Sequence, residues 1–164
     1  MPRPFPPAVI SAAQACEIAT RIPASVTLAQ WAIESAWGER VTGTNNYFGI
    51  KAKKGSLPKD YTMCATHETI GGRSVPCMQP FQNYDTMASG FMAHAALLAS
   101  GSPYADARKV LMPGWQDPAH VRAFVDAFGE VYATARDYDK TIISEMNARN
   151  LYQYDQFAVR GGKA

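Results

Sequence analysis

The chain carries little charge for its length, and the charge is not gathered into any block. Asp, Glu, Lys and Arg make up only 18% of the 164 residues, and the formal net charge is +2. A nucleic-acid-binding domain usually has a dense basic stripe that follows the phosphates, so this class is disfavoured. The 47% of hydrophobic residues indicates a folded globular chain. We expect a single domain over residues 1–164, and a monomer.

The sequence also lacks a long apolar run. No stretch approaches the roughly 18 residues that a membrane span requires. Residues 1–7 (MPRPFPP) place prolines where a secretory signal would have its apolar region. We therefore expect synthesis in the cytoplasm without a signal peptide, and no insertion into a membrane.

Cysteine is scarce, and its spacing does not fit a metal site. The three cysteines form no Cys-x-x-Cys pair, which disfavours a zinc centre, and no Ser-His-Asp or Cys-His order indicates a peptidase or amidase. Cys64 and Cys77 flank a predicted hairpin. In a register with Ile70 and Gly71 at the turn, the two cysteines would face each other. They could then form a disulfide outside a reducing cytoplasm, and two free thiols are an equal alternative.

Helical signals cover most of the chain and are interrupted once. Helices are predicted at residues 11–21, 27–37 and 85–100, and others begin at Ser102, Asp117 and Asp137. From residue 55 to 81 the helical period is lost, and Gly71-Gly72 is typical of a hairpin turn. The predicted fold class is mainly α (α+β), a helical body with a small β lobe. Glu17, in the first helix, is expected to be a solvated charge.

Glu34 is the most informative position, because it is one carboxylate on an otherwise uncharged, aromatic helix. Helical spacing places it beside Gln30, Trp31 and Trp37. Apolar surroundings raise the pKa of a carboxyl group, and a general acid that works near neutral pH needs such a pKa. The alternative is an ordinary ion pair, for instance with Arg40, and for a lone helical Glu this is the commoner case.

Three blocks of sequence favour the catalytic alternative. They are residues 34–38 (ESAWG), 45–52 (NNYFGIKA) and 132–135 (YATA), with Tyr138 and Lys140 beyond. In order and spacing these blocks resemble the signature of glycoside hydrolase family 73, the peptidoglycan endo-β-N-acetylglucosaminidases. That family includes the flagellar rod hydrolase domain. The resemblance runs from about residue 26 to 143. It departs at Ala135, where the family usually has Asp, and at Tyr47, where Leu or Ile is common.

The resemblance implies a lysozyme-like fold and a cofactor-independent hydrolase that cuts peptidoglycan glycan strands between N-acetylglucosamine and N-acetylmuramic acid. Glu34 would protonate the leaving oxygen. The family's second carboxylate lies in a comparable hairpin, so Glu68 is the candidate for the second group, with an exposed pair to Arg73 as the alternative. Tyr132, which lines the cleft in the family, would orient water or the N-acetyl group, unless it is a core aromatic.

The same blocks predict the residues that bind sugar. Asn46, Phe48, Trp37 and Tyr138 are expected to line the groove, with the Asn46 amide bonding to sugar or to backbone, and the aromatic faces covering pyranose rings. An Asn-Asn pair is equally typical of a simple turn.

Two other functions stay open. One is a muramidase or lytic transglycosylase acting on the same polymer, and the other is a non-catalytic wall-binding module. Because no signal peptide is visible, we expect the chain to reach the wall or periplasm by holin-type release, as a phage endolysin does, or by delivery in a phage particle or secretion apparatus.

Overall fold

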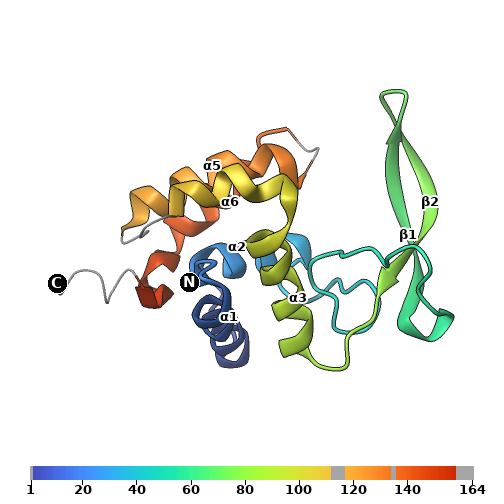
Figure 1. Ribbon diagram of the computed structural model, residues 1–164, viewed down its shortest axis with the longest axis horizontal. Helices are drawn as coiled ribbons and strands as arrows, with labels where there is room; N and C mark the ends of the chain where they lie inside the picture. The colour runs from blue at the N-terminus through green and yellow to red at the C-terminus, as the bar shows by residue number, and fades with distance from the viewer. Residues whose placement is uncertain (1, 112–116, 134–135, 158–164) are drawn as a thin grey trace.

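The computed structural model describes residues 2–111, 117–133 and 136–157. They form a helical body from which a β hairpin projects (Figure 1). The helices are α1 (Pro7–Thr20), α2 (Ala24–Glu34), α3 (Met87–Ser100), α4 (Ala105–Arg108), α5 (Pro118–Tyr132) and α6 (Tyr138–Ala148), with short 3-10 turns η1 (Pro58–Asp60), η2 (Ser102–Tyr104), η3 (Lys109–Leu111) and η4 (Leu151–Tyr154). The hairpin joins β1 (Tyr61–Ile70) to β2 (Arg73–Gln82). The predicted mainly α (α+β) class is confirmed.

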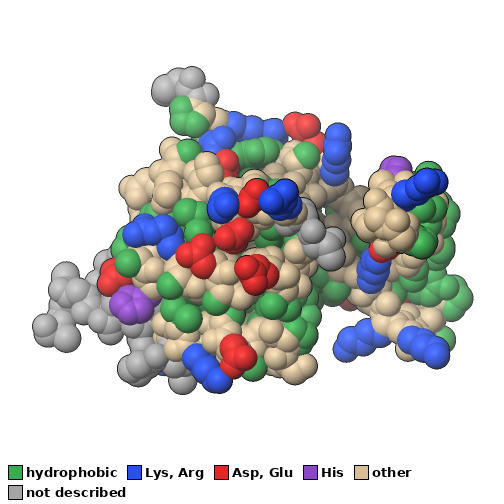
Figure 2. Space-filling model, turned by 90° about the horizontal axis from the view of Figure 1, so that it is seen from above, with side chains coloured by type: hydrophobic (Ala, Val, Ile, Leu, Met, Phe, Trp, Pro, Cys, Tyr) green, Lys and Arg blue, Asp and Glu red, His purple; other side chains and the backbone are tan. Residues whose placement is uncertain are grey.

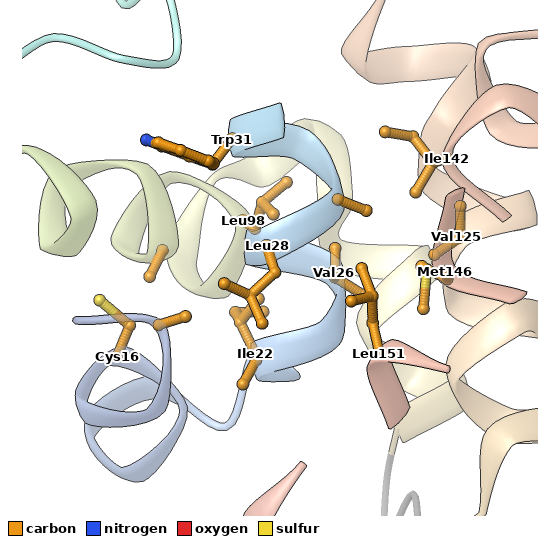
Figure 3. Close-up of a cluster of buried hydrophobic side chains, with 14 of the residues drawn as sticks. Cys16, Ile22, Val26, Leu28, Trp31, Leu98, Val125, Ile142, Met146 and Leu151 are labelled. Atoms are coloured by element: carbon orange, nitrogen blue, oxygen red, sulfur yellow. The ribbon is translucent and has the colours of Figure 1, made fainter. Parts of the chain in front are cut away.

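Helix α2 is the central element of the body. Its first nine residues are all buried, and it packs against α1, α6 and η4. Figure 3 shows Val26 of α2 turned toward Met146 and Leu151, while Leu28 lies toward Leu98 of α3. A helix that is enclosed on every side must be apolar all round, which explains why α2 has no charge before Glu34, its last residue.

The start of α2 is held by buried carboxyl groups from elsewhere in the chain. Glu17 of α1 accepts the Ala24 N–H (2.7 Å), and Asp155 accepts the Ser25 N–H (2.7 Å) and hydroxyl (2.8 Å). Glu17 is fully buried, so its prediction as a solvated charge is wrong. The first N–H groups of a helix need acceptors, and these tertiary acceptors allow α2 to begin three residues before the predicted start at residue 27.

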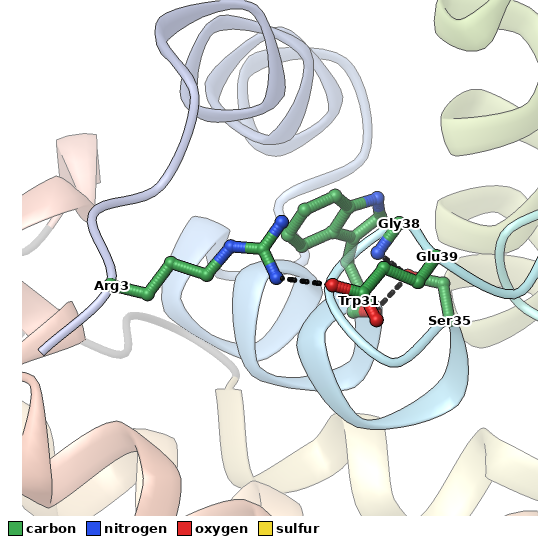
Figure 4. A network of polar contacts seen from close by, with 5 residues as sticks. All are labelled: Arg3, Trp31, Ser35, Gly38 and Glu39. Carbon is green, nitrogen blue, oxygen red and sulfur yellow. Dashed lines mark hydrogen bonds and ion pairs between the residues drawn. The ribbon is translucent and has the colours of Figure 1, made fainter.

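The end of α2 also comes three residues earlier than predicted. Ala36 and Trp37 have positive φ angles (47° and 62°), which breaks the helix after Glu34. The Ser35 hydroxyl donates to the Trp31 carbonyl (2.6 Å) and accepts the N–H of Gly38 (2.8 Å), as Figure 4 shows. Trp37 therefore does not share a helical face with Glu34.

The hairpin turn falls at residues 71–72, where both glycines have positive φ (58° and 78°). A two-residue turn of this hand requires positive φ at both positions, so the Gly-Gly prediction is confirmed. The resulting register places Cys64 opposite Gln79 and Cys77 opposite Thr66. The register with Ile70 in the turn is wrong, the two cysteines do not face each other, and both are free thiols.

The described residues contain neither a membrane-spanning helix nor a metal-binding cluster. None of the helices there is long and apolar enough to cross a bilayer. Likewise, no group of three or more His, Cys, Asp or Glu side chains within these ranges is placed to hold a metal ion.

Candidate active site

Glu34 and Tyr138 form the centre of the candidate site. The Tyr138 hydroxyl, at the start of α6, donates to Glu34 Oε1 (2.6 Å) and accepts from Gln30 Nε2 (3.1 Å). Gln30 lies one turn before Glu34 on α2, as the helical spacing predicted. One carboxyl oxygen is therefore fixed in place by a relay of two buried side chains.

The second carboxyl oxygen of Glu34 is free for chemistry. Within the described residues Oε2 makes no hydrogen bond, and Glu34 makes no ion pair, so the predicted alternative of a pair with Arg40 is wrong. Burial raises the pKa of Glu34, and the hydrogen bond from Tyr138 opposes this rise. Burial favours the protonated form of Glu34, and a proton on the untethered Oε2 is placed where it can be passed to a substrate.

Tyr132, the last residue of α5, covers the Glu34–Tyr138 pair. Its ring stacks on Tyr138, with centroids 5.5 Å apart and planes at 11°, and packs edge-on against His94 (5.9 Å). The side chain is half-buried. Burial raises its pKa well above the usual value, and the nearby Glu34 charge adds to the rise. Tyr132 is thus a neutral phenol at the border between the core and the site.

Phe48 belongs to the core and not to the groove. It is only 4% exposed, and it stacks on His94 with ring centroids 3.9 Å apart. It also packs edge-on against Phe91 of α3 (5.1 Å). The prediction that Phe48 covers a sugar ring is wrong, because its faces are taken by other rings. Burial lowers the pKa of His94 to about 3, so this histidine is neutral.

Asn46 has a structural role. It is 1% exposed, and its Nδ2 donates to the carbonyls of Ile50 (2.8 Å) and Gln82 (3.0 Å). Its Oδ1 accepts the Ile50 N–H (3.0 Å). The backbone alternative is therefore confirmed and the sugar-binding one is wrong. The side chain ties the loop after α2 to the end of β2.

Trp37 is held by residues near both ends of the chain. Its ring packs on Phe5 (4.6 Å), and the Arg149 guanidinium lies 4.2 Å from the ring centroid. Arg3 lies over the same ring (5.8 Å) and pairs with Glu39 (2.8 Å; Figure 4). This packing covers part of the half-buried Trp37 side chain, and its place in the sugar groove stays a prediction.

Glu68 lies in β1 opposite Val75. It lies close to the hairpin turn and pairs with Lys51, and not with Arg73 as the alternative predicted. Its polar contacts in the described structure do not include Glu34 or Tyr138. A hollow separates the β lobe from the helical body (Figure 2).

The chain departs from the family signature at Tyr47 and at Ala135. Tyr47 packs between Trp31 (6.4 Å) and Phe91 (5.9 Å), so an aromatic ring fits that position. Ala135 lies outside the described residues, as does Thr134 in the same block.

Fold and site together define a class of protein: a helical body with a β-hairpin lobe, in which the central helix ends on a half-buried carboxyl group, that of Glu34. The chain belongs to the glucosaminidase family, whose description is mannosyl-glycoprotein endo-β-N-acetylglucosaminidase and whose model matches residues 10–151. The resemblance to glycoside hydrolase family 73 is confirmed.

Several known proteins are similar to this chain. Exo-glucosaminidase LytG of Bacillus subtilis is 28% identical over 134 residues, which are 80% of this chain and 46% of that protein. An autolysin of Enterococcus faecalis is 27% identical over 146 residues, 87% of this chain and 19% of that protein. The chain thus spans less than half the length of these curated relatives. The crystal structure of a peptidoglycan hydrolase mutant from Sphingomonas sp. A1 superposes with a TM-score of 0.71 at 25% identity, covering 90% of this chain and 94% of that one, which confirms the lysozyme-like fold.

Proposed function

We propose that the chain hydrolyses the β-1,4 bond between N-acetylglucosamine and N-acetylmuramic acid in peptidoglycan, with Glu34 as the general acid. The observation that carries the proposal is the state of the Glu34 carboxyl group. Its Oε1 is fixed by Tyr138, its Oε2 is free, and burial raises its pKa. Breaking a glycosidic bond requires a positioned acid of this kind to protonate the leaving oxygen.

The second group must be anionic or nucleophilic, and this limits the candidates. Tyr132 keeps its proton at neutral pH because its pKa is raised, so it serves as a hydrogen-bond donor to water or to the N-acetyl group, and not as the base. Glu68 pairs with Lys51, which suits an ionised carboxylate. Either Glu68 activates water from the β lobe, or the acetamido group of the substrate acts as the internal nucleophile.

A Glu68→Gln variant separates these two routes. If Glu68 is the base, the rate of bond cleavage falls by about 10²-fold or more. If the acetamido group is the nucleophile, the variant keeps nearly the wild-type rate, and N-acetylglucosaminyl-thiazoline, a mimic of the cyclised intermediate, inhibits both proteins.

The identity of the products tests the proposed bond. Purified sacculi are digested, the products are reduced with borohydride, and the reduced sugars are identified by mass spectrometry. New reducing ends on N-acetylglucosamine are expected. Reducing ends on N-acetylmuramic acid would indicate a muramidase and 1,6-anhydro-muramyl ends a lytic transglycosylase, and either result contradicts the proposal. The route to the wall expected from the sequence, by holin or by a phage or secretion apparatus, stays a prediction.

A further inference from the structure

One face of the β hairpin is largely apolar and carries no acidic or basic side chain. Paired residues of an antiparallel sheet point to the same side, and side chains alternate along each strand. The odd-numbered positions of β1 and the even-numbered positions of β2 therefore share one face, which we call the outer face. Among these described positions no Asp, Glu, Lys or Arg occurs. The aliphatic members of the outer face are Met63, Ala65, Pro76, Met78 and Pro80.

The outer face is turned to solvent and away from the helical body. Met63 and Met78 are 48% and 56% exposed, whereas Cys64, Glu68 and Cys77 on the other face are half-buried. Figure 2 shows hydrophobic side chains gathered on the side of the lobe that faces away from the body. Met63 pairs with Pro80 and Ala65 with Met78, so these side chains adjoin one another. Contiguous exposed apolar surface of this kind is typical of an interaction site.

The lobe that carries the outer face is basic. Residues 51–82 contain five Lys or Arg and two Asp or Glu, a formal charge of +3, whereas the whole chain has only +2. Lys53, Lys54 and Lys59 are exposed and make no ion pair within the described chain. Leu57, between these lysines in sequence, is 56% exposed. The lobe thus combines an apolar face with unpaired positive charges.

We propose that the outer face rests on a membrane surface that contains anionic lipids. Such a surface matches both features, because its headgroups attract the lysines and its acyl chains receive the methionines. A second copy of the chain is a poorer match, since two lobes of net positive charge repel each other. An anionic wall polymer can pair with the lysines but offers no apolar phase to the methionines.

The proposed contact is interfacial and does not cross the bilayer. Beyond the Lys51–Phe81 bridge at its base, the two-stranded sheet has edges with unpaired backbone N–H and C=O groups, which cannot enter hydrocarbon. Only one face can settle at the boundary of headgroups and acyl chains, about 5–10 Å deep. Glu68 lies on the opposite face and stays open to water. The membrane contact is therefore compatible with the proposed hydrolysis and does not depend on it.

Co-sedimentation with lipid vesicles tests the proposal. Vesicles of phosphatidylglycerol and phosphatidylcholine are compared with vesicles of phosphatidylcholine alone, at physiological ionic strength. The wild type is expected to bind the anionic vesicles about tenfold more tightly, as a few lysines near a negative surface would produce. Thermal unfolding shows that each variant used below is folded.

The apolar part of the contact is tested with two double variants. Met63→Ser with Met78→Ser is expected to bind anionic vesicles about tenfold more weakly, because two apolar side chains no longer enter the acyl boundary. The control is Ile18→Ser with Leu97→Ser, which removes two exposed apolar side chains (61% and 40%) from α1 and α3. This control is expected to bind as the wild type does.

The charged part is tested in the same assay. Lys54→Glu is expected to weaken binding about fivefold or more, while Arg40→Glu, the same change of charge at an exposed position outside the lobe, changes it much less.

Three results would overturn the proposal. The first is no binding of the wild type to anionic vesicles, or equal binding by the two double variants. The second is binding that Lys54→Glu loses but the methionine variant keeps, which would assign the lobe to anionic polymers. The third is a wild-type dimer in sedimentation velocity that the methionine variant dissociates, which would assign the outer face to a second copy of the chain.

Discussion

At the residue scale, the proposed catalysis depends on the surroundings of one carboxyl group, that of Glu34. The relay from Gln30 through Tyr138 fixes one oxygen of Glu34, while burial favours the protonated form. The two influences act in opposite directions on the pKa, because burial disfavours the carboxylate and the hydrogen bond stabilises it. The balance of the two sets how readily Glu34 holds and releases its proton.

Tyr138→Phe tests this balance. Loss of the hydroxyl removes the donor that lowers the pKa of Glu34, so the pKa rises and the alkaline limb of the kcat/KM profile moves to higher pH. The lost positioning also lowers kcat several-fold, equivalent to about 1 kcal/mol for one hydrogen bond. Tyr152→Phe, which removes a hydroxyl bonded to Asn147, is the control and leaves the profile unchanged. An alkaline limb that stays in place or moves down contradicts the relay.

Asn46→Ala separates a structural from a sugar-binding role. The variant leaves the Ile50 N–H and the Gln82 carbonyl without their Asn46 partner, while the Ile50 carbonyl keeps the N–H of Gln82 (3.0 Å). At about 1–3 kcal/mol for each of the two groups, the expected cost is about 2–6 kcal/mol of unfolding free energy. Chemical denaturation measures this loss. KM of the folded fraction is expected to stay the same, and the exposed Asn147→Ala serves as control. Unchanged stability with a raised KM would restore the sugar-binding prediction.

The sequence singles out Glu34 but does not show that Phe48 and Asn46 are buried. Glu34 could be predicted because its isolation on an apolar helix and its motif are both visible in the sequence, and Gln30 followed from helical spacing. Phe48 and Asn46 were misassigned because a motif records which residues are present and not which way they point. Both are turned inward by contacts with α3 and β2, which are distant in sequence.

At the element scale, the start of α2 depends on a buried pair of acids. Burial raises the pKa of Asp155 to about 7, and the neighbouring Glu17, whose own pKa is also raised by burial, adds to the rise. Around them, the Ser25 hydroxyl and backbone N–H groups of α2 and of residues 156–157 donate to the two carboxyl groups. The pair connects α1, α2 and the segment after η4.

This pair predicts how stability changes with pH. The pKa values of Asp155 and Glu17 are higher in the folded protein than in the unfolded chain, so the folded state binds protons more tightly. The stabilisation from this difference is fully present below about pH 4 and is lost as the pH rises through about 7. Each pKa unit corresponds to about 1.4 kcal/mol. Urea unfolding between pH 4.5 and 7.5 measures the loss.

Asp155→Asn is expected to reduce the pH-dependent loss, while the exposed Asp126→Asn keeps it. An Asp155→Asn variant with the same pH dependence as the wild type would show that the pair does not share a proton in the folded state.

Elements could be predicted where their signals are local. The Gly-Gly turn and the start of α5 are of this kind, since the Asp117 side chain accepts the His120 N–H (3.0 Å) and Pro118 follows it. The bounds of α2 and the strand register around Cys64 and Cys77 were missed. The start of α2 depends on Asp155, which is more than 100 residues away in sequence. The register of the hairpin shifts when the turn moves by one residue.

At the scale of the whole molecule, the fold divides the work between two parts. The helical body holds Glu34 at the end of its central helix, and the β lobe, across the hollow seen in Figure 2, carries Glu68. Fold class and family could be predicted because three sequence blocks span most of the chain. The position of the lobe could not, because no local signal encodes the distance between Glu34 and Glu68.

The central claim is that Glu34 supplies the proton, and one measurement tests it directly. Glu34→Gln keeps an acceptor for the Tyr138 hydroxyl but removes the proton donor, so the release of new reducing ends from purified sacculi should fall by about 10²–10⁴-fold, the usual worth of a general acid. Binding to sacculi in a sedimentation assay should stay near wild type, and Glu39→Gln, an exposed neighbour paired with Arg3, should cleave normally. Undiminished release of reducing ends by Glu34→Gln would contradict the account.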